Sequence, residues 1–291
     1  MSLEPIVNSV LNYIPEAEVG QVCFDAQGSG FDADAILSGM EAMNPDLVLY
    51  AGPANGPFMP DAKAVRRIRD KKPLVNIICD GGDAGSHAGI AAFQKAESFS
   101  FHVNIDGMHT WPYQKNDITT LCPIDQTAYD SEIRKDISLG FYGGDGHKDR
   151  RDILQALGSA CVRGTRNEKY GSYRAYADFL KRCTFTLNHA ANGSNTGMHC
   201  KARTLEAGLA YSVLLEPKGS PIRYYFQPGR DYLEWETAHD ILQHVTLLST
   251  SEIHAMRESL RERVIQYYSA DKFWSLVFDH LAHVEGLSRW L

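Results

Sequence analysis

The sequence lacks several features that would assign it at once to a class of protein. Its six cysteines stand singly and form no Cys-x-x-Cys pair, a pattern more typical of buried thiols than of zinc ligands or disulfides in a chain of 291 residues. It also has no long run of lysine and arginine, and its net charge is −7, from 29 basic and 36 acidic residues. The charge therefore argues against nucleic acid as a partner.

A long apolar segment is missing as well. No apolar run approaches the ~18 residues that a membrane-spanning helix needs. Residues 1–20 contain no lysine or arginine, whereas a secretory signal begins with a positively charged region. These features predict a cytoplasmic protein without a membrane span.

The sequence does contain a repeated alternation of short apolar runs with helical patterns. The run Pro73 to Cys79 (PLVNIIC) is almost continuously apolar, which is typical of a strand covered on both faces in a parallel sheet. The first half of the chain predicts strands at 18–25, 46–50, 73–79, 98–105 and 119–123, and helices at 32–43, 61–71 and 83–96.

After a polar, charged stretch around residues 125–135 the alternation begins again. The second half predicts strands at 137–142, near Cys161, at 185–188 and at 212–215, and helices at 148–157, 173–182, 196–210 and from Thr237 to the end. Repeated strand–helix units predict an α/β protein with two doubly wound, Rossmann-like domains. We expect these at residues 1–132 and 133–270, with a helical segment at 271–291.

Ligands of parallel α/β sheets collect at the carboxyl ends of the strands, so the residues that follow each strand are the first candidates. Asp80 and Asp83 follow the strand at 73–79, and paired carboxylates can divide the roles of acid and base. A flexible turn with a helix cap explains them equally well. His102, Asp106 and His109 lack the spacing and the further ligand of a metal site, so no metal is predicted.

Gly28 and Gly30 belong to a G-x-G-x-x-A segment between a predicted strand and helix, which is a weak match to a dinucleotide-binding turn. The acidic residue that would hold a ribose is missing near residues 50–52, where Tyr-Ala-Gly stands. Asp32 and Asp34 form a D-x-D pair at the start of a helix, where capping is a better explanation than metal binding.

The second half offers a more informative set of residues. Gly143 and Gly144 follow a predicted strand, and Arg150 lies in the helix that comes next, with Lys148 and Arg151 as basic neighbours. Backbone N–H groups and cations in this arrangement can bind a diphosphate. Further along the chain, Lys201, Arg203 and Glu206 lie on one predicted helix, and Arg203 and Glu206 are three residues apart, so they can project together. A surface ion pair is the alternative.

Taken together, these segments resemble the nucleotide-sugar-binding half of a GT-B glycosyltransferase, in particular the spore-coat-type glycosyltransferase-like proteins. The resemblance runs from Ile137 to about Trp274. It is carried by ISLGFYGG…DRRDILQALG, FTLNHA, KARTLEAGLAYSVLLE (201–216), YYFQPGRDYLEWETAHDIL (224–242) and ERVIQYYSADKFW (262–274).

The resemblance implies a GT-B architecture of two facing domains and a nucleoside diphosphate sugar as donor, with no cofactor and no bound metal. The donor diphosphate would lie near Gly143 and Gly144 with Lys201 and Arg203, and Glu206 would bind the nucleotide ribose. Sugar transfer would occur in the cleft between the domains. The last helix would pack back on the first domain.

An acceptor base would come from the first domain, with Asp80, Asp83 and His109 as candidates in that order. Many retaining relatives carry a second glutamate eight residues before the ribose-binding one, where this chain has Met198, while Glu216 lies ten residues after it. The stereochemical course therefore stays open. The alternatives are an NAD(P)-dependent oxidoreductase that uses the Gly28–Gly30 turn, and a nucleotide-sugar-binding protein without catalysis.

Overall fold

The computed structural model describes residues 4–20, 33–52, 59–79, 81–107, 113–144, 146–164, 172–192 and 197–286. The chain divides into two compact units, each of which is described by itself. Unit 1 comprises residues 1–12, 122–191 and 198–272, and unit 2 comprises residues 13–121, 192–197 and 273–291.

Unit 1 is built on a parallel sheet, which in the described residues has five strands in the order β6-β5-β7-β8-β9. Its strands are β5 (Ile137–Tyr142), β6 (Val162–Gly164), β7 (Cys183–Leu187), β8 (Val213–Pro217) and β9 (Leu233–Trp235). The chain moves from β5 to β6 on one side and then returns to place β7 on the other side of β5. The topological switch point, where such sheets bind their ligands, therefore lies between β5 and β7.

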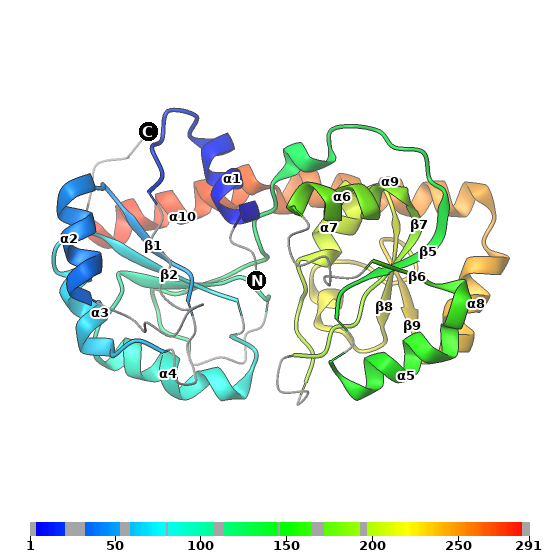
Figure 1. Ribbon diagram of the computed structural model, residues 1–291, viewed down its shortest axis with the longest axis horizontal. Coiled ribbons are helices and arrows are strands. Elements are labelled where there is room, and N and C mark those ends of the chain that lie inside the picture. The colour runs from blue at the N-terminus through cyan, green and yellow to red at the C-terminus, as the bar shows by residue number, and fades with distance from the viewer. Residues whose placement is uncertain are drawn as a thin grey trace. The chain divides into compact units, whose positions relative to one another are not determined.

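Helices cover both faces of this sheet. Figure 1 shows α6, α7 and α9 on one face and α5 and α8 on the other. The helices of unit 1 are α1 (Glu4–Tyr13), η1 (Gln126–Tyr129), α5 (Lys148–Leu157), η2 (Gly158–Ala160), α6 (Tyr173–Arg182), α7 (Arg203–Leu209), η3 (Pro221–Tyr224), α8 (Ala238–Leu247) and α9 (Thr250–Tyr268). Helix α10 (Ala270–Glu285) follows α9, and most of its residues belong to unit 2.

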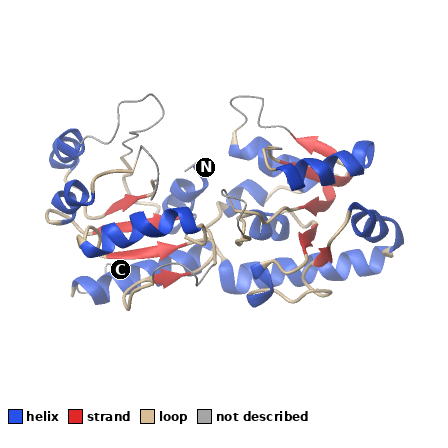
Figure 2. Cartoon of the chain, turned by 90° about the horizontal axis from the view of Figure 1, so that it is seen from below, coloured by secondary structure: helices blue, strands red, loops and turns tan. Residues whose placement is uncertain are grey.

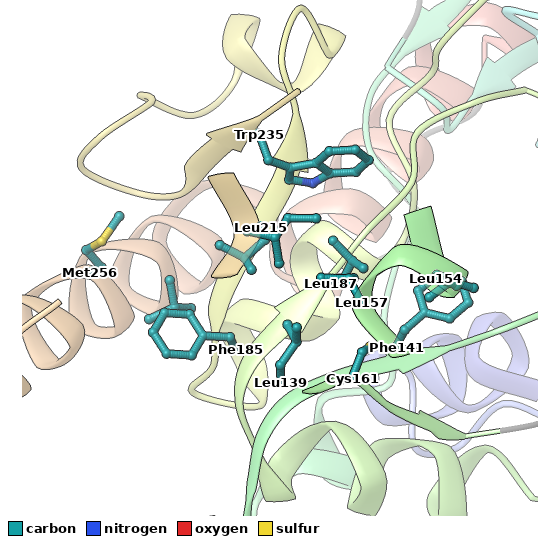
Figure 3. Close-up of a cluster of buried hydrophobic side chains, with 12 residues drawn as sticks. Leu139, Phe141, Leu154, Leu157, Cys161, Phe185, Leu187, Leu215, Trp235 and Met256 are labelled. Carbon is teal, nitrogen blue, oxygen red and sulfur yellow. The ribbon is translucent and has the colours of Figure 1, made fainter. Parts of the chain in front are cut away.

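The core of unit 1 explains why these segments fold as they do. Leu139 and Phe141 alternate along β5 and are buried against Leu154 of α5 and Leu187 of β7 (Figure 3). Each fully buried side chain of this size contributes about 1.5–3 kcal/mol relative to an exposed one. This face of β5 is thus packed in the core, up to the residue before Tyr142, and the glycine turn follows directly after the strand.

Unit 2 contains a second parallel sheet, with strand order β1-β2-β3-β4 in the described part of the chain. Every residue of the central strand β2 is buried, as the continuous apolar run at 73–79 predicts. Helices flank the strands in both units (Figure 2). The elements of unit 2 are α2 (Ala33–Met43), β1 (Val48–Tyr50), α3 (Ala62–Arg69), β2 (Leu74–Ile78), α4 (Ala84–Lys95), β3 (Phe101–Asn104) and β4 (Ile118–Thr119).

The predicted α/β class with parallel sheets is confirmed. The helix expected at 196–210 is wrong in its first half, because Met198 and His199 pair with the chain after β7 instead. Met198 bridges to Ala191, and the N–H of His199 donates to the carbonyl oxygen of Ala190 at 3.0 Å. Helix α7 therefore begins only at Arg203.

The single helical finish expected from Thr237 is divided, over the described residues 237–286, into three helices. Thr237 and Ser249 each form a capping box that starts a new helix, because the side chain at the cap and an acidic side chain three residues later bond each other's backbone. Strand β9 and helix α1 are elements that the sequence patterns do not predict. Most of the strand expected at 18–25 lies outside the described residues, and Glu18–Gly20 carry no strand. Within the described ranges, every helix is too short or too polar to cross a bilayer.

Candidate functional site

The glycine turn after β5 is the centre of the candidate site. Gly143 has a φ of 151°, a conformation that favours glycine. A β-carbon at this position would lie 3.3 Å from the ring of Phe141 and 3.6 Å from Nη2 of Arg203. At Gly144 a β-carbon would meet no atom within 4 Å. The backbone of the turn is therefore closely packed at its first glycine and open at its second.

Helix α5 brings basic side chains onto this turn. Arg150 donates from Nη1 to the carbonyl oxygen of Gly144 at 2.8 Å, and Arg151 donates to that of Gly146 at 2.9 Å. The guanidinium of Arg150 also lies 5.9 Å from the ring centroid of Phe141. Asp145 lies outside the described residues.

Arg203, the first residue of α7, reaches the same turn from the other side. Its guanidinium lies 5.2 Å from the ring centroid of Phe141, so Arg150 and Arg203 share one aromatic ring. Arg203 also donates to the carbonyl oxygen of Tyr142, and its Nε donates to the hydroxyl of Tyr176 at 3.4 Å. Two residues that are 53 positions apart in the sequence thus meet at the carboxyl end of β5.

Lys201 completes what we call the basic cluster, which consists of Arg150, Lys201 and Arg203. Its Nζ is hydrogen-bonded to Nε2 of His199. Burial, followed by the charges of Arg150 and Lys201, lowers the pKa of His147. Burial, followed by the charge of Arg150, also lowers the pKa of His189, to about 4, with Lys201 as a smaller cause. Both histidines are therefore neutral near pH 7, and the positive charge resides on the two arginines and the lysine.

Glu206 lies one turn beyond Arg203 on α7 and is 6% exposed. Its Oε2 accepts a hydrogen bond of 2.5 Å from the hydroxyl of Tyr176, and its Oε1 accepts one of 3.3 Å from Tyr173. The hydroxyl of Tyr129 lies 3.2 Å from that of Tyr173. The predicted projection of Arg203 and Glu206 from one helix is thus observed, and both contact Tyr176.

Glu216 lies at the carboxyl end of β8 and is fully buried. Its two oxygens accept hydrogen bonds from Asn188 at 2.7 Å and from Ser220 at 2.6 Å. Burial raises the pKa of this carboxyl to about 7, although the hydrogen bonds and the charges of Arg203 and Lys201 act in the opposite direction. Glu216 therefore connects the segments that follow β7 and β8, and it is close enough to Arg203 and Lys201 for their charges to act on it.

Among the candidates for the acceptor base in the first half of the chain, the structure describes only Asp83. Asp83 is 6% exposed and caps α4, accepting from the N–H of Gly85 at 3.0 Å. This is the capping alternative that the sequence left open. Asp80, His109 and the Gly28–Gly30 turn lie outside the described residues.

Other polar residues of unit 2 have structural partners. Nδ1 of His102 lies 2.9 Å from Nδ2 of Asn76, and burial lowers the pKa of His102 to about 3. Asp106 accepts from the N–H of Gly82 at 2.7 Å, and Asp34 forms an exposed ion pair with Arg67. In the part of the chain that the structure describes, no three His, Cys, Asp or Glu side chains gather as metal ligands would.

Two surface cavities are separate from the basic cluster. One of about 470 Å³ borders α9 and includes Glu252 and Ser259, and one of about 320 Å³ in unit 2 includes Arg66 and His102. Neither contains a residue of the glycine turn or the basic cluster. We therefore define the candidate site by the charged side chains that converge at the switch point, and not by a cavity.

Comparison with known proteins agrees with a candidate site in unit 1. Residues 137–277 match the family described as "Glycosyl transferase-like". The match spans the glycine turn, the basic cluster and Glu206, and it covers slightly less than half of the chain. The resemblance expected from the sequence is thus confirmed. No curated protein sequence matches the chain.

Solved structures share the fold at low sequence identity. Anabaena HepE in complex with UDP and glucose has a TM-score of 0.61 and 11% identity, with 86% of this chain and 80% of that chain covered. The pneumococcal O-GlcNAc transferase GtfA with UDP and GlcNAc has a TM-score of 0.51 and 12% identity over 86% and 60%. The Candida albicans trehalose-6-phosphate phosphatase N-terminal domain has a TM-score of 0.53 and 8% identity over 86% and 73%. These likenesses support the GT-B architecture of two Rossmann-like domains.

The residues that support the site are not among those predicted from the sequence. Tyr173 and Tyr176 stand three residues apart in a helix whose bounds the sequence predicts correctly. The sequence therefore indicates that the two tyrosines share one face of this helix. Nothing in the sequence indicates that this face meets α7. The stacking of Arg150 and Arg203 on Phe141 likewise depends on the tertiary fold.

Proposed function

We propose that the protein is a glycosyltransferase that moves a sugar from a nucleoside diphosphate sugar to an acceptor hydroxyl. The donor diphosphate binds at the glycine turn Gly143–Gly144 and is held by the basic cluster. Glu206 accepts hydrogen bonds from the nucleotide ribose. The observation that carries the proposal is the convergence of Arg150, Lys201 and Arg203 at the topological switch point of unit 1.

The proposed chemistry follows from where charge develops. The bond between the sugar carbon and the diphosphate oxygen breaks, a bond from that carbon to the acceptor oxygen forms, and the acceptor proton passes to a base. Negative charge grows on the leaving diphosphate, so fixed cations at that position lower the barrier, often as the largest catalytic effect. Arginine suits this role because its donors match phosphate oxygens two at a time.

The neutral histidines strengthen this proposal. Because the pKa values of His147 and His189 are lowered, neither is the main source of positive charge near pH 7. That charge is carried by the basic cluster. The proposal requires no metal ion, because the basic cluster supplies the charge that a divalent cation would otherwise provide. We accordingly expect EDTA to leave the transfer activity unchanged.

Thermal unfolding with a panel of nucleotides tests the proposal. We expect UDP or another nucleoside diphosphate to raise the melting temperature, and the matching nucleoside without phosphates to have no effect, because a ligand that binds only the folded state stabilises it. Nucleotide sugars that bind are then incubated with the protein, and the released nucleotide is measured. Absence of a melting shift with UDP, GDP, ADP and CDP contradicts the proposal. Binding without any release of nucleotide favours a non-catalytic module instead.

A further inference from the structure

The hydroxyl of Tyr176 lies between two residues of the site. It accepts a hydrogen bond from Nε of Arg203 at 3.4 Å and donates one to Oε2 of Glu206 at 2.5 Å. We propose that Tyr176 is a positioning residue that couples Arg203 to Glu206, so that the diphosphate and the ribose of the donor are bound cooperatively. This inference rests on the proposed function of the same site.

The two oxygens of Glu206 are held unequally. The bond from Tyr176 to Oε2 is at the short end of the usual 2.5–3.0 Å for hydroxyl donors, whereas the bond from Tyr173 to Oε1 is 3.3 Å. A carboxylate can accept about four hydrogen bonds. A ribose hydroxyl can therefore take Oε1 as its acceptor while Tyr176 keeps Oε2 in place.

Tyr176 can do this only as a neutral phenol. Burial raises its pKa, and the nearby charge of Glu206 raises it further. The hydroxyl therefore keeps its proton throughout the physiological range, donates to Glu206 and offers its lone pairs to Arg203. A donor–acceptor chain of this kind polarises in one direction, so each bond strengthens the other.

The aromatic ring of Tyr176 has a separate, packing role. It lies 4.8 Å from the ring centroid of Tyr142 and 5.9 Å from that of Tyr173. Phenylalanine at this position would keep those ring contacts and remove only the hydroxyl. Tyr173→Phe is a matched control, because it removes a hydroxyl donor to the same carboxylate from the same helix.

Affinities for UDP and for inorganic pyrophosphate, measured by calorimetry, test the coupling. We expect Tyr176→Phe to weaken UDP binding about tenfold or more, and Tyr173→Phe less than about threefold, since a short bond to a charged group is worth more than a long one. Both variants should melt close to the wild type. Equal losses in the two variants, or no loss in Tyr176→Phe, overturn the inference.

Pyrophosphate provides a readout that a purely structural role would not change. It lacks a ribose, so Glu206→Gln can affect its binding through Tyr176 and through the loss of a negative charge close to Arg203, and the second effect is common to both backgrounds. We expect Glu206→Gln to weaken pyrophosphate binding several-fold in the wild-type background, and not to weaken it in Tyr176→Phe. Unchanged or stronger binding by Glu206→Gln in the wild-type background overturns the coupling even if Tyr176→Phe does not fold. A wild type that binds neither UDP, GDP, ADP, CDP nor pyrophosphate refutes the proposed function itself.

Discussion

Arg150 donates a hydrogen bond of 2.8 Å to the carbonyl oxygen of Gly144, so a side chain of α5 is fixed to the glycine turn that precedes it. The guanidinium of Arg150 lies 5.9 Å from the ring centroid of Phe141, and that of Arg203 lies 5.2 Å from the same centroid. The turn, Arg150 and Arg203 are thus connected, and their contributions can be tested separately.

The first prediction concerns the position of positive charge. We expect Arg150→Ala to weaken UDP binding by about tenfold or more, because a charge-assisted hydrogen bond contributes about 1.5–3 kcal/mol. Arg182→Ala is the control, since it removes the same charge at the amino end of β7, where Arg182 pairs with Asp136 on the surface. Calorimetric titration compares the two. Equal losses would mean that overall charge, and not the turn, attracts the nucleotide.

The second prediction separates the two glycines. Gly143→Ala should destabilise the protein by about 1–3 kcal/mol, because alanine is strained at a φ of 151° and its β-carbon would lie 3.3 Å from the Phe141 ring. Gly144→Ala should change the stability by less than about 0.5 kcal/mol, because the space around it is open. Urea unfolding measures both. Equal stability of the two variants would contradict the described turn.

The third prediction concerns pH. The pKa of Glu216 is raised to about 7 in the folded protein, above its usual value of 4.5, so its contribution to stability is complete below pH 4.5 and is lost as the pH rises towards 7. Glu216→Gln cannot ionise and keeps the shape of the side chain. We expect the wild type to lose about 1–3 kcal/mol relative to this variant between pH 5 and pH 8. If the free energies of unfolding of the wild type and of Glu216→Gln, measured in urea, change with pH in parallel over that range, the raised pKa of Glu216 is refuted.

The fourth prediction addresses Asp83, a catalytic candidate from the sequence. The structure gives it a capping bond to the N–H of Gly85. We expect Asp83→Ala to cost about 1 kcal/mol of stability and Asp83→Asn to cost little, because asparagine is also a good cap. Sugar transfer should be unchanged in Asp83→Asn. Normal melting with a large loss of turnover would restore the catalytic role.

Local patterns are sufficient to predict many elements of this protein. Strand Ile137–Tyr142 and helices Lys148–Leu157 and Tyr173–Arg182 have the bounds that the sequence predicts, because their apolar spacing and end signals agree. The helix expected at 196–210 fails for the opposite reason. Its helical spacing competes with backbone pairing to Ala190 and Ala191, which no local signal reveals.

The residues of the candidate site also fall into those that local patterns predict and those that depend on the tertiary structure. The glycine pair after a strand and the three-residue spacing of Arg203 and Glu206 are local features, and the diphosphate site predicted from them stays a prediction. Asp80 and His109 stay predictions, because they lie outside the described residues.

The sequence by itself determined the alternation of strands and helices, the segment that matches the glycosyl transferase-like family, and the charged residues that one helix can present together. Only the tertiary structure decided that Arg150 and Arg203 share the ring of Phe141, and that Tyr176 connects Arg203 to Glu206. The physical reason is that periodicity specifies which face of each element is buried. The partner of that face is selected only when strand order and side-chain packing bring distant segments together.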